Sequence, residues 1–259
     1  MIADADGVPM AITLDDLKVK LFTDGADKAQ IVDMARNTWI AGFTTNPSLL
    51  KKAGVRDYEA YGRDLVAAVP DRHISFEVFS DDIPEMIAQG RLIASWGSNV
   101  YVKLPVSTTR KEPLFDAVRA LSADGVKINL TAIFTADQVK SAVEALRGGA
   151  PACVSVFAGR LADFGIDYAP LMQDAIAQAR ATSNIEIIWA STREPYNVIE
   201  ADRMGCHIIT APADVLKKLP ALGTKTGADL SLDAVKAFRE DALAAGLQLK
   251  LTGRSEAAE

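Results

Sequence analysis

The chain has 259 residues, of which 49% are hydrophobic and 24% are charged, and its net charge is −6. This composition is typical of a globular protein with a large core. An acidic chain without a basic block lacks the signature of a nucleic-acid-binding surface, and no uncharged apolar run is long enough to span a membrane.

The few residues with redox or metal chemistry predict a cytoplasmic protein that needs neither a disulfide nor a metal. Cys153 and Cys206 each lie in an apolar run, where a reduced core cysteine is expected. His73 and His207 are far apart and lack the spacing of metal ligands. The acidic N-terminal segment is unlike the basic start of a signal peptide.

Short apolar runs alternate with longer amphipathic ones along the chain. The expected strands are residues 19–23, 40–44, 74–79, 99–106, 127–133, 152–157, 185–190 and 206–210. Helical spacing of apolar residues is clearest at 58–69, 83–95, 114–121, 136–146 and 171–181. Eight strand–helix repeats in this length predict an α/β fold, a single (β/α)8 barrel. The alternative, a doubly wound open sheet, usually has fewer strands, and the glycine-rich turn of its dinucleotide-binding form is absent.

No linker divides the sequence, so residues 1–259 are expected to form one barrel domain. A further helix is expected at 231–245, after the eighth strand, with Ser231 as its N-cap. Residues 1–15 are expected to be irregular, and residues 252–259 to form a disordered tail.

Polar side chains gather toward the carboxyl ends of the predicted strands, where barrel enzymes place their active sites. Each has a structural explanation by itself: Asp24 could cap the next helix, and Asn46 could be a cap or start a turn before Pro47. Their convergence is harder to explain by structure alone. Because buried polar groups must be paired, these side chains should form one network with each other or with a ligand.

Lys103 stands out because it lies inside an apolar strand, on the opposite face from Val102 and Leu104. A lysine in such a position is either a snorkelling or ion-paired side chain, or a functional amine. A neutral amine is the nucleophile that forms Schiff bases with carbonyl groups.

The surrounding residue types suit aldol chemistry. An imine on Lys103 would withdraw electrons from a ketose, and Asp24 or Glu77 could accept the proton of its C4 hydroxyl. Arg160 and Arg193 follow the sixth and seventh strands, near the usual phosphate site of barrels, although either could be a surface charge.

The chain resembles the transaldolase family, which includes the short fructose-6-phosphate aldolases, from about residue 17 to 245. The matching segments are Leu-Phe-Thr-Asp at 21–24, Gly-Phe-Thr-Thr-Asn-Pro-Ser at 42–48, Val-Lys-Leu-Pro-Val at 102–106, Asn-Leu-Thr at 129–131, Ser-Val-Phe-Ala-Gly-Arg at 155–160 and Ala-Ser-Thr-Arg at 190–193. The second and third segments, in this order and spacing, are the most specific.

The resemblance implies a role for each matching residue. Lys103 would form the Schiff base, Asp24 would act as acid and base at the C4 hydroxyl, and Glu77 and Thr131 would hold the catalytic water. The implied substrate-binding residues are Thr45, Asn46, Asn129, Ser155, Phe157, Arg160, Ser191 and Arg193. Among these substrate-binding residues, Arg160, Ser191 and Arg193 would bind the phosphate. No cofactor is implied; the implied partners are phosphorylated sugars and further copies of the chain, in carbohydrate metabolism such as the pentose phosphate pathway.

Three positions favour a transferase over a lyase, by the same resemblance. Glu77 stands where the aldolases have glutamine, Phe157 stands where they have tyrosine, and they lack the amide of Asn129. A phenylalanine cannot donate a proton to the enamine, which leaves time for an acceptor. We therefore expect a transaldolase that moves a dihydroxyacetone unit from sedoheptulose 7-phosphate or fructose 6-phosphate to an aldose phosphate. A lyase that releases dihydroxyacetone, a transaldolase with an unusual donor and a barrel that only binds sugar phosphates are the alternatives.

Overall fold

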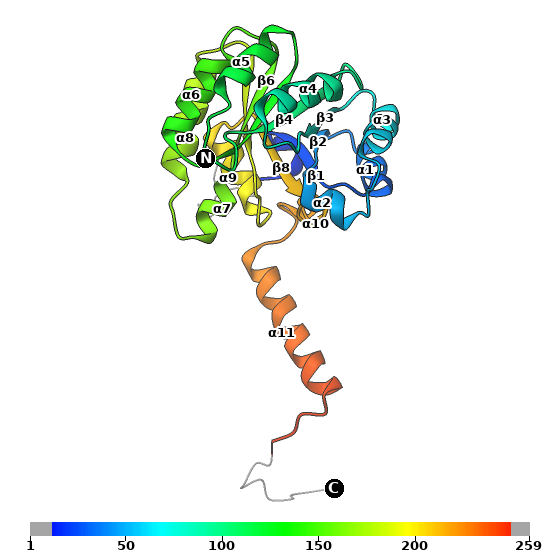
Figure 1. Cartoon of the computed structure of the whole chain (residues 1–259). Coiled ribbons are helices and arrows are strands. Elements are labelled where there is room, and N and C mark those ends of the chain that lie inside the picture. Colours follow the sequence, from blue (N-terminus) through cyan, green and yellow to red (C-terminus); the bar gives the residue numbers. More distant parts are fainter. Residues whose placement is uncertain (1–11, 250–259) are drawn as a thin grey trace, which may run out of the picture. The chain divides into compact units, whose positions relative to one another are not determined.

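The computed structural model describes residues 12–249. They belong to two compact units, one spanning Asp15–Leu219 and the other containing residues 12–14 and 220–249. The first unit contains eight parallel strands that close into a barrel in chain order, and helices surround the strands (Figure 1). The strands are β1 (Lys20–Asp24), β2 (Ile40–Thr44), β3 (His73–Glu77), β4 (Val100–Pro105), β5 (Ile128–Ile133), β6 (Ala152–Val156), β7 (Ile185–Trp189) and β8 (Ile208–Pro212).

The helices of the barrel unit follow the expected alternation. They are α1 (Lys28–Ala35), α2 (Pro47–Lys52), α3 (Tyr58–Ala68), α4 (Ile83–Ala94), α5 (Phe115–Ala123), α6 (Ala136–Leu146), α7 (Ala158–Asp163), α8 (Ala169–Arg180), α9 (Tyr196–Met204) and α10 (Ala213–Leu216). The predicted (β/α)8 barrel is therefore confirmed. The strand and helix boundaries of the barrel differ from the expected ones by no more than two residues, as is usual for element ends.

The C-terminal helix of the second unit is confirmed, but its expected start is wrong. Helix α11 spans Gly227–Ala244 and is capped by Thr226 rather than Ser231. The Thr226 side chain accepts a hydrogen bond from the Asp229 backbone amide, and the Asp229 side chain accepts one in return from the Thr226 amide. This reciprocal capping box satisfies two free amides at once, which a lone serine five residues later could not do.

The expected irregular N-terminal segment is only partly described. Within it, Leu14–Asp16 forms a 3₁₀ turn, η1, and a second such turn, η2, spans Leu219–Ala221. Residues 1–11 and the expected tail at 252–259 lie outside the described residues. The assignment of the whole chain to a single domain stays a prediction. No helix in the described ranges is long and apolar enough to cross a membrane.

An apolar cluster lies inside the barrel, below the polar ends of its strands. Phe22, Cys153, Ile188 and Ile208 form a buried cluster, against which Tyr101 packs. Each of these residues precedes a pocket-lining residue by two positions, so both lie on the inner face of the same strand. This apolar cluster therefore lies beneath the pocket, beside the buried Ser75 and Asn129, which pair in register with Tyr101 and Cys153.

Two backbone irregularities shape the carboxyl end of the barrel. In β5 the register with β6 shifts between Leu130 and Ile133, and Ala132 has a left-handed φ of 61°. After β7, Ser191 also has a left-handed φ, of 65°. Such conformations are unfavourable for non-glycine residues and are concentrated at functional sites. Both lie beside the same pocket.

Candidate active site

One pocket at the carboxyl end of the barrel, with a volume of about 500 Å³, collects all but two of the predicted site residues. Its lining includes Asp24, Asn46, Glu77, Lys103, Thr131, Ser155, Phe157, Arg160, Ser191 and Arg193. The exceptions are Thr45 and Asn129, which are fully buried behind it. Residues from most of the strands and the loops that follow them thus face one cavity, as a barrel active site requires.

Lys103 is held at the floor of this pocket by two oxygen atoms. Its side chain extends from β4 and is only 9% exposed. The Nζ atom donates a hydrogen bond of 3.0 Å to the carbonyl oxygen of Thr45 and lies 3.2 Å from Oε2 of Glu77. The snorkelling alternative is excluded by this burial, because the amine stays inside the barrel with its hydrogen bonds satisfied. Thr45 therefore holds the lysine through its carbonyl oxygen and does not itself line the pocket.

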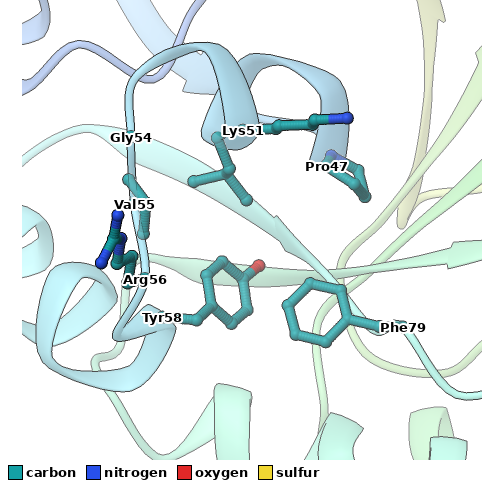
Figure 2. Close-up of a pocket in the computed structure, with 8 residues that line it drawn as sticks. Pro47, Lys51, Gly54, Val55, Arg56, Tyr58 and Phe79 are labelled. Atoms are coloured by element: carbon teal, nitrogen blue, oxygen red, sulfur yellow. The ribbon is translucent and has the colours of Figure 1, made fainter.

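The backbone of Glu77 is anchored from outside the barrel. The Tyr58 hydroxyl, on α3, donates a hydrogen bond of 3.0 Å to the Glu77 carbonyl oxygen. Burial raises the pKa of Tyr58 above its ordinary value, which keeps the hydroxyl protonated as a donor. The rings of Tyr58 and Phe79 lie 4.5 Å apart and line a neighbouring hollow together with Lys51 and Pro47 (Figure 2).

That hollow has a similar volume, about 520 Å³, but its side chains offer different chemistry. Its two cationic residues, Lys51 and Arg56, are accompanied by no carboxylate in the lining. Lys51 is exposed, in contrast to the buried Lys103. An exposed lysine without a nearby acid or base is poorly suited to covalent catalysis. The pocket around Lys103 is therefore the better candidate.

Asp24, at the end of β1, is held by a chain of threonines. The Thr44 hydroxyl donates to Oδ1 of Asp24 at 2.8 Å and lies 2.6 Å from the Thr210 hydroxyl. Burial raises the pKa of Asp24, while the Lys103 charge and the Thr44 hydrogen bond lower it. A carboxyl group poised in this way can exchange a proton with a substrate more readily than an exposed aspartate.

Thr131 offers a hydroxyl with no hydrogen-bond partner among the described residues, although its oxygen is buried. Buried hydroxyl groups in proteins are almost always paired. Because Thr131 also lines the pocket, its hydroxyl is available to a ligand or a bound water.

Asn46 has the structural role expected of it, and it can still contact a ligand. Its Oδ1 atom accepts a hydrogen bond of 3.0 Å from the Leu49 amide and so caps α2. With the oxygen engaged, the amide NH₂ is the group that Asn46 can offer to a ligand in the pocket.

Asn129 does not line the pocket, and it acts on Ser155 instead. The Ser155 hydroxyl donates to Oδ1 of Asn129 at 2.7 Å, and Nδ2 of Asn129 donates to the Ser75 hydroxyl at 3.0 Å. Ser155 reaches the pocket while Asn129 is fully buried. The binding of substrate by Asn129, which the sequence suggested, stays a prediction, and in this structure Asn129 contacts the pocket through Ser155.

The arginines form the opposite side of the pocket. Arg160 lies over the Phe157 ring, with its guanidinium 5.2 Å from the ring centroid. Nε of Arg193 lies 3.0 Å from the Asp163 carboxylate on α7, and this pairing holds the pKa of Asp163 below its ordinary value. Both arginines are exposed, so their charges are accessible to an anion that enters the pocket.

A glycine allows the two arginine segments to approach each other. A Cβ atom on Gly159, at the start of α7, would lie 1.7 Å from the carbonyl oxygen of Ser191. The Gly159 amide also donates to the Ala190 carbonyl oxygen at 3.4 Å. Any side chain at this position would separate α7 from the loop after β7 and widen the distance between the arginines.

Several supporting residues were not predicted from the sequence, among them Thr44, Thr210, Tyr58 and Asp163. Thr210 had a detectable signal, because it is a polar residue at the carboxyl end of the expected eighth strand. Tyr58 and Asp163 had none, since their roles depend on how α3 and α7 pack against other segments. In the described part of the chain, no three His, Cys, Asp or Glu side chains are grouped to hold a metal ion.

Comparisons with known proteins show which family the chain resembles. Residues 21–255 match the family model described as "Transaldolase/Fructose-6-phosphate aldolase". The chain is 36% identical over 232 residues to a "Probable transaldolase" of Thermoanaerobacter sp. (strain X514), covering 89% of this chain and 100% of the relative. It is 41% identical over 203 residues to a "Probable transaldolase" of Clostridium acetobutylicum, covering 78% and 89%.

A structural comparison supports the fold alone. A putative lyase/mutase from Burkholderia cenocepacia J2315 aligns with a TM-score of 0.54 at 15% identity, covering 91% of this chain and 89% of that one. The family itself is shown by the match over most of the chain and by the similar relatives. This protein therefore belongs to the transaldolase/fructose-6-phosphate aldolase family.

Proposed function

We propose that the protein is a transaldolase that transfers a dihydroxyacetone unit between sugar phosphates through a Schiff base on Lys103. The observation that carries this proposal is a buried lysine 3.2 Å from one carboxylate, with a second carboxyl group in the same pocket and two arginines on its far side. These are the groups that a covalent aldol transfer of a phosphorylated ketose requires.

The first steps build the imine. Nζ of Lys103 attacks the C2 carbonyl of the ketose, and the carbinolamine loses its hydroxyl as water. Glu77 is close enough to Nζ to take a proton from the amine and return one to the departing hydroxyl, directly or through a water held with Thr131. The resulting protonated imine is the electron sink for the next step.

Cleavage follows at the bond between C3 and C4. Asp24 accepts the proton of the C4 hydroxyl, the C3–C4 electrons move toward the imine, and an aldose phosphate leaves. Burial raises the pKa of Asp24, so this carboxylate is a stronger base than an ordinary aspartate. The remaining enamine attacks the carbonyl carbon of an acceptor, and the same steps in reverse release the new ketose.

The arginines fit the phosphate end of the substrate. Arg160 and Arg193 lie on the side of the pocket formed by the segments after β6 and β7, and both guanidinium groups are exposed. Arginine is suited to phosphate because it offers parallel N–H donors as well as charge. Fructose 6-phosphate and sedoheptulose 7-phosphate are the proposed donors, with glyceraldehyde 3-phosphate and erythrose 4-phosphate as acceptors.

The choice of transfer over release rests on Phe157. Its ring lines the pocket and carries no hydroxyl, so it cannot supply the proton that would convert the enamine into free dihydroxyacetone. The test is to measure glyceraldehyde 3-phosphate release from fructose 6-phosphate with and without erythrose 4-phosphate. Release that depends on the acceptor, with sedoheptulose 7-phosphate formed, supports a transaldolase. Equal release in both tubes, with free dihydroxyacetone, would establish a lyase instead.

A further inference from the structure

Four side chains from three strands form a continuous hydrogen-bonded row across the barrel interior. The row runs from His73 and Ser75 on β3, through Asn129 on β5, to Ser155 on β6. Nε2 of His73 lies 3.0 Å from the Ser75 hydroxyl, which accepts from Nδ2 of Asn129, whose Oδ1 accepts from the Ser155 hydroxyl. Only Ser155 among the four lines the pocket.

The Ser75 hydroxyl determines in which direction the hydrogen bonds of this row are donated. Ser75 is fully buried and has one proton to donate. Since its oxygen already accepts from Asn129, its proton has to go to the other neighbour, Nε2 of His73. If Nε2 carried a proton instead, two donors would meet at one oxygen and the buried Ser75 proton would have no acceptor among these residues. That arrangement leaves a buried donor unsatisfied and is costly.

The environment of His73 keeps its ring neutral. The imidazole stacks on the Tyr101 ring, with centroids 3.6 Å apart, and meets the edge of Phe22 at 4.7 Å. Burial, with the nearby charges of Lys127 and Lys20, lowers the pKa of His73 to about 3. The ring is therefore neutral at physiological pH, and one of its nitrogens is an acceptor.

We propose that His73 is a positioning residue that fixes the direction of hydrogen-bond donation along this row. As a result, the Ser155 oxygen can only accept a hydrogen bond from the substrate. With its proton committed to Asn129, the Ser155 oxygen accepts a hydrogen bond and donates none. This inference rests on the proposed function, in which the partner of Ser155 is the C1 hydroxyl of the donor ketose. Ser155 then selects a donor group at C1.

Removal of the acceptor at position 73 would free the row to reverse. The Asn129 amide would rotate, Ser75 would donate to its oxygen, and its nitrogen would donate to Ser155. All buried donors would still be paired, but the Ser155 proton would now point into the pocket. The change at position 73 is thus transmitted to the substrate without any contact between His73 and the substrate.

The experiment compares fructose 6-phosphate with its 1-deoxy-1-fluoro analogue, whose fluorine cannot donate a hydrogen bond. The ratio of the two kcat/KM values measures how strongly the enzyme demands a donor at C1. His73→Phe keeps the ring stack on Tyr101 but removes the acceptor, and we expect it to lower this ratio by at least about tenfold. His73→Gln offers an amide oxygen in place of Nε2 and should restore the wild-type ratio.

A merely structural role for His73 predicts a different outcome. It would lower kcat/KM for both ketoses by the same factor and leave the ratio unchanged, which would overturn the inference. Ser75→Ala provides a second test if the His73→Phe protein does not fold. It interrupts the row without disturbing the aromatic stack, and it should lower the ratio as well.

An NMR measurement tests the same inference without turnover. The wild-type protein with ¹⁵N-labelled histidine should show Nε2 of His73 as the unprotonated, acceptor-type nitrogen at neutral pH. A proton on Nε2 would overturn the proposed direction of donation, even if the enzyme proves to be a transaldolase. Absence of turnover in a wild-type protein that shows the expected tautomer would count against the proposed function and not against the direction of the row.

Discussion

The charged side chains are buried on one side of the pocket and exposed on the other. On the side of β1, β3 and β4, the Lys103 and Glu77 side chains are 9% and 17% exposed and lie 3.2 Å apart. On the side of α7 and the loop after β7, the Arg193 and Asp163 side chains are 47% and 43% exposed. The first side buries its charges among fixed partners, and the second leaves them open to water.

The difference follows from what each side has to do. Proton transfer and imine formation need groups that are held close together in fixed positions. Recognition of a phosphate needs accessible donors that can exchange one anion for another, and an exposed ion pair costs little to open. Substitutions on the buried side should therefore change the chemistry, whereas substitutions on the open side should change binding.

The largest expected effect is at the nucleophile. Lys103→Met removes the amine that forms the imine, and we expect turnover to fall by a factor on the order of 10⁴ or more. Lys51→Met is the matched control, because Lys51 is an exposed lysine of the neighbouring hollow. It should retain most of the activity. Substantial turnover by a folded Lys103→Met protein would refute the assignment of the nucleophile.

The next largest effect should come from the open side. Arg193→Ala should raise KM for fructose 6-phosphate by about 10- to 100-fold, which is the range expected for loss of a charge-assisted hydrogen bond. Reaction with unphosphorylated dihydroxyacetone should change little. Arg180→Ala, which removes an exposed arginine bonded to the Gly205 carbonyl, is the control. Equal losses for phosphorylated and unphosphorylated compounds would show that Arg193 does not bind the phosphate.

A hydroxyl group at Phe157 should alter the fate of the enamine. Phe157→Tyr places a proton donor on a ring that lines the pocket, and the acceptor-independent release of dihydroxyacetone should rise several-fold. Phe134→Tyr is the matched control, because the Phe134 ring contacts Phe157 at 5.3 Å but does not line the pocket. An equal rise in both variants would indicate a general loosening of the site.

The smallest expected effect is a shift in pH dependence. The Thr44 hydroxyl bonds to Asp24 and lowers its pKa, so Thr44→Val should raise that pKa further. Because Asp24 must be ionised to accept a proton, the acidic limb of the kcat/KM profile should move to higher pH when this hydrogen bond is lost. A shift to lower pH would contradict the assignment of Asp24 as the base.

Much of the fold could be predicted because barrel strands have a simple pattern. Residues 99–106 alternate between the helix-facing and inner surfaces, and the expected strand agrees with β4 (Val100–Pro105). The register of a parallel barrel then brings the carboxyl ends of the strands together, which placed Asp24, Glu77 and Lys103 in one site. The start of α11 was harder, because both Ser231 and Thr226 are acceptable N-caps and only the partner at Asp229 distinguishes them.

The position of Asn129 in the barrel shows most clearly what could not be predicted from the sequence. Strand parity correctly placed it on the inner face of β5, but parity does not tell how deep a residue lies in the barrel. Depth depends on the stagger of neighbouring strands, which leaves Asn129 beneath the pocket and Ser155 inside it. The Asp163–Arg193 pair was unpredictable for a similar reason, since it depends on the close approach of α7 that Gly159 permits.

The most direct test of the account is to locate the covalent adduct. The wild-type protein would be incubated with fructose 6-phosphate, reduced with borohydride, digested and mapped by mass spectrometry. We predict one modified peptide, which contains Lys103 and carries the reduced dihydroxyacetone unit. An adduct on Lys51 or another lysine, or no adduct in a protein that turns over the substrate, would contradict the central claim that Lys103 forms the Schiff base.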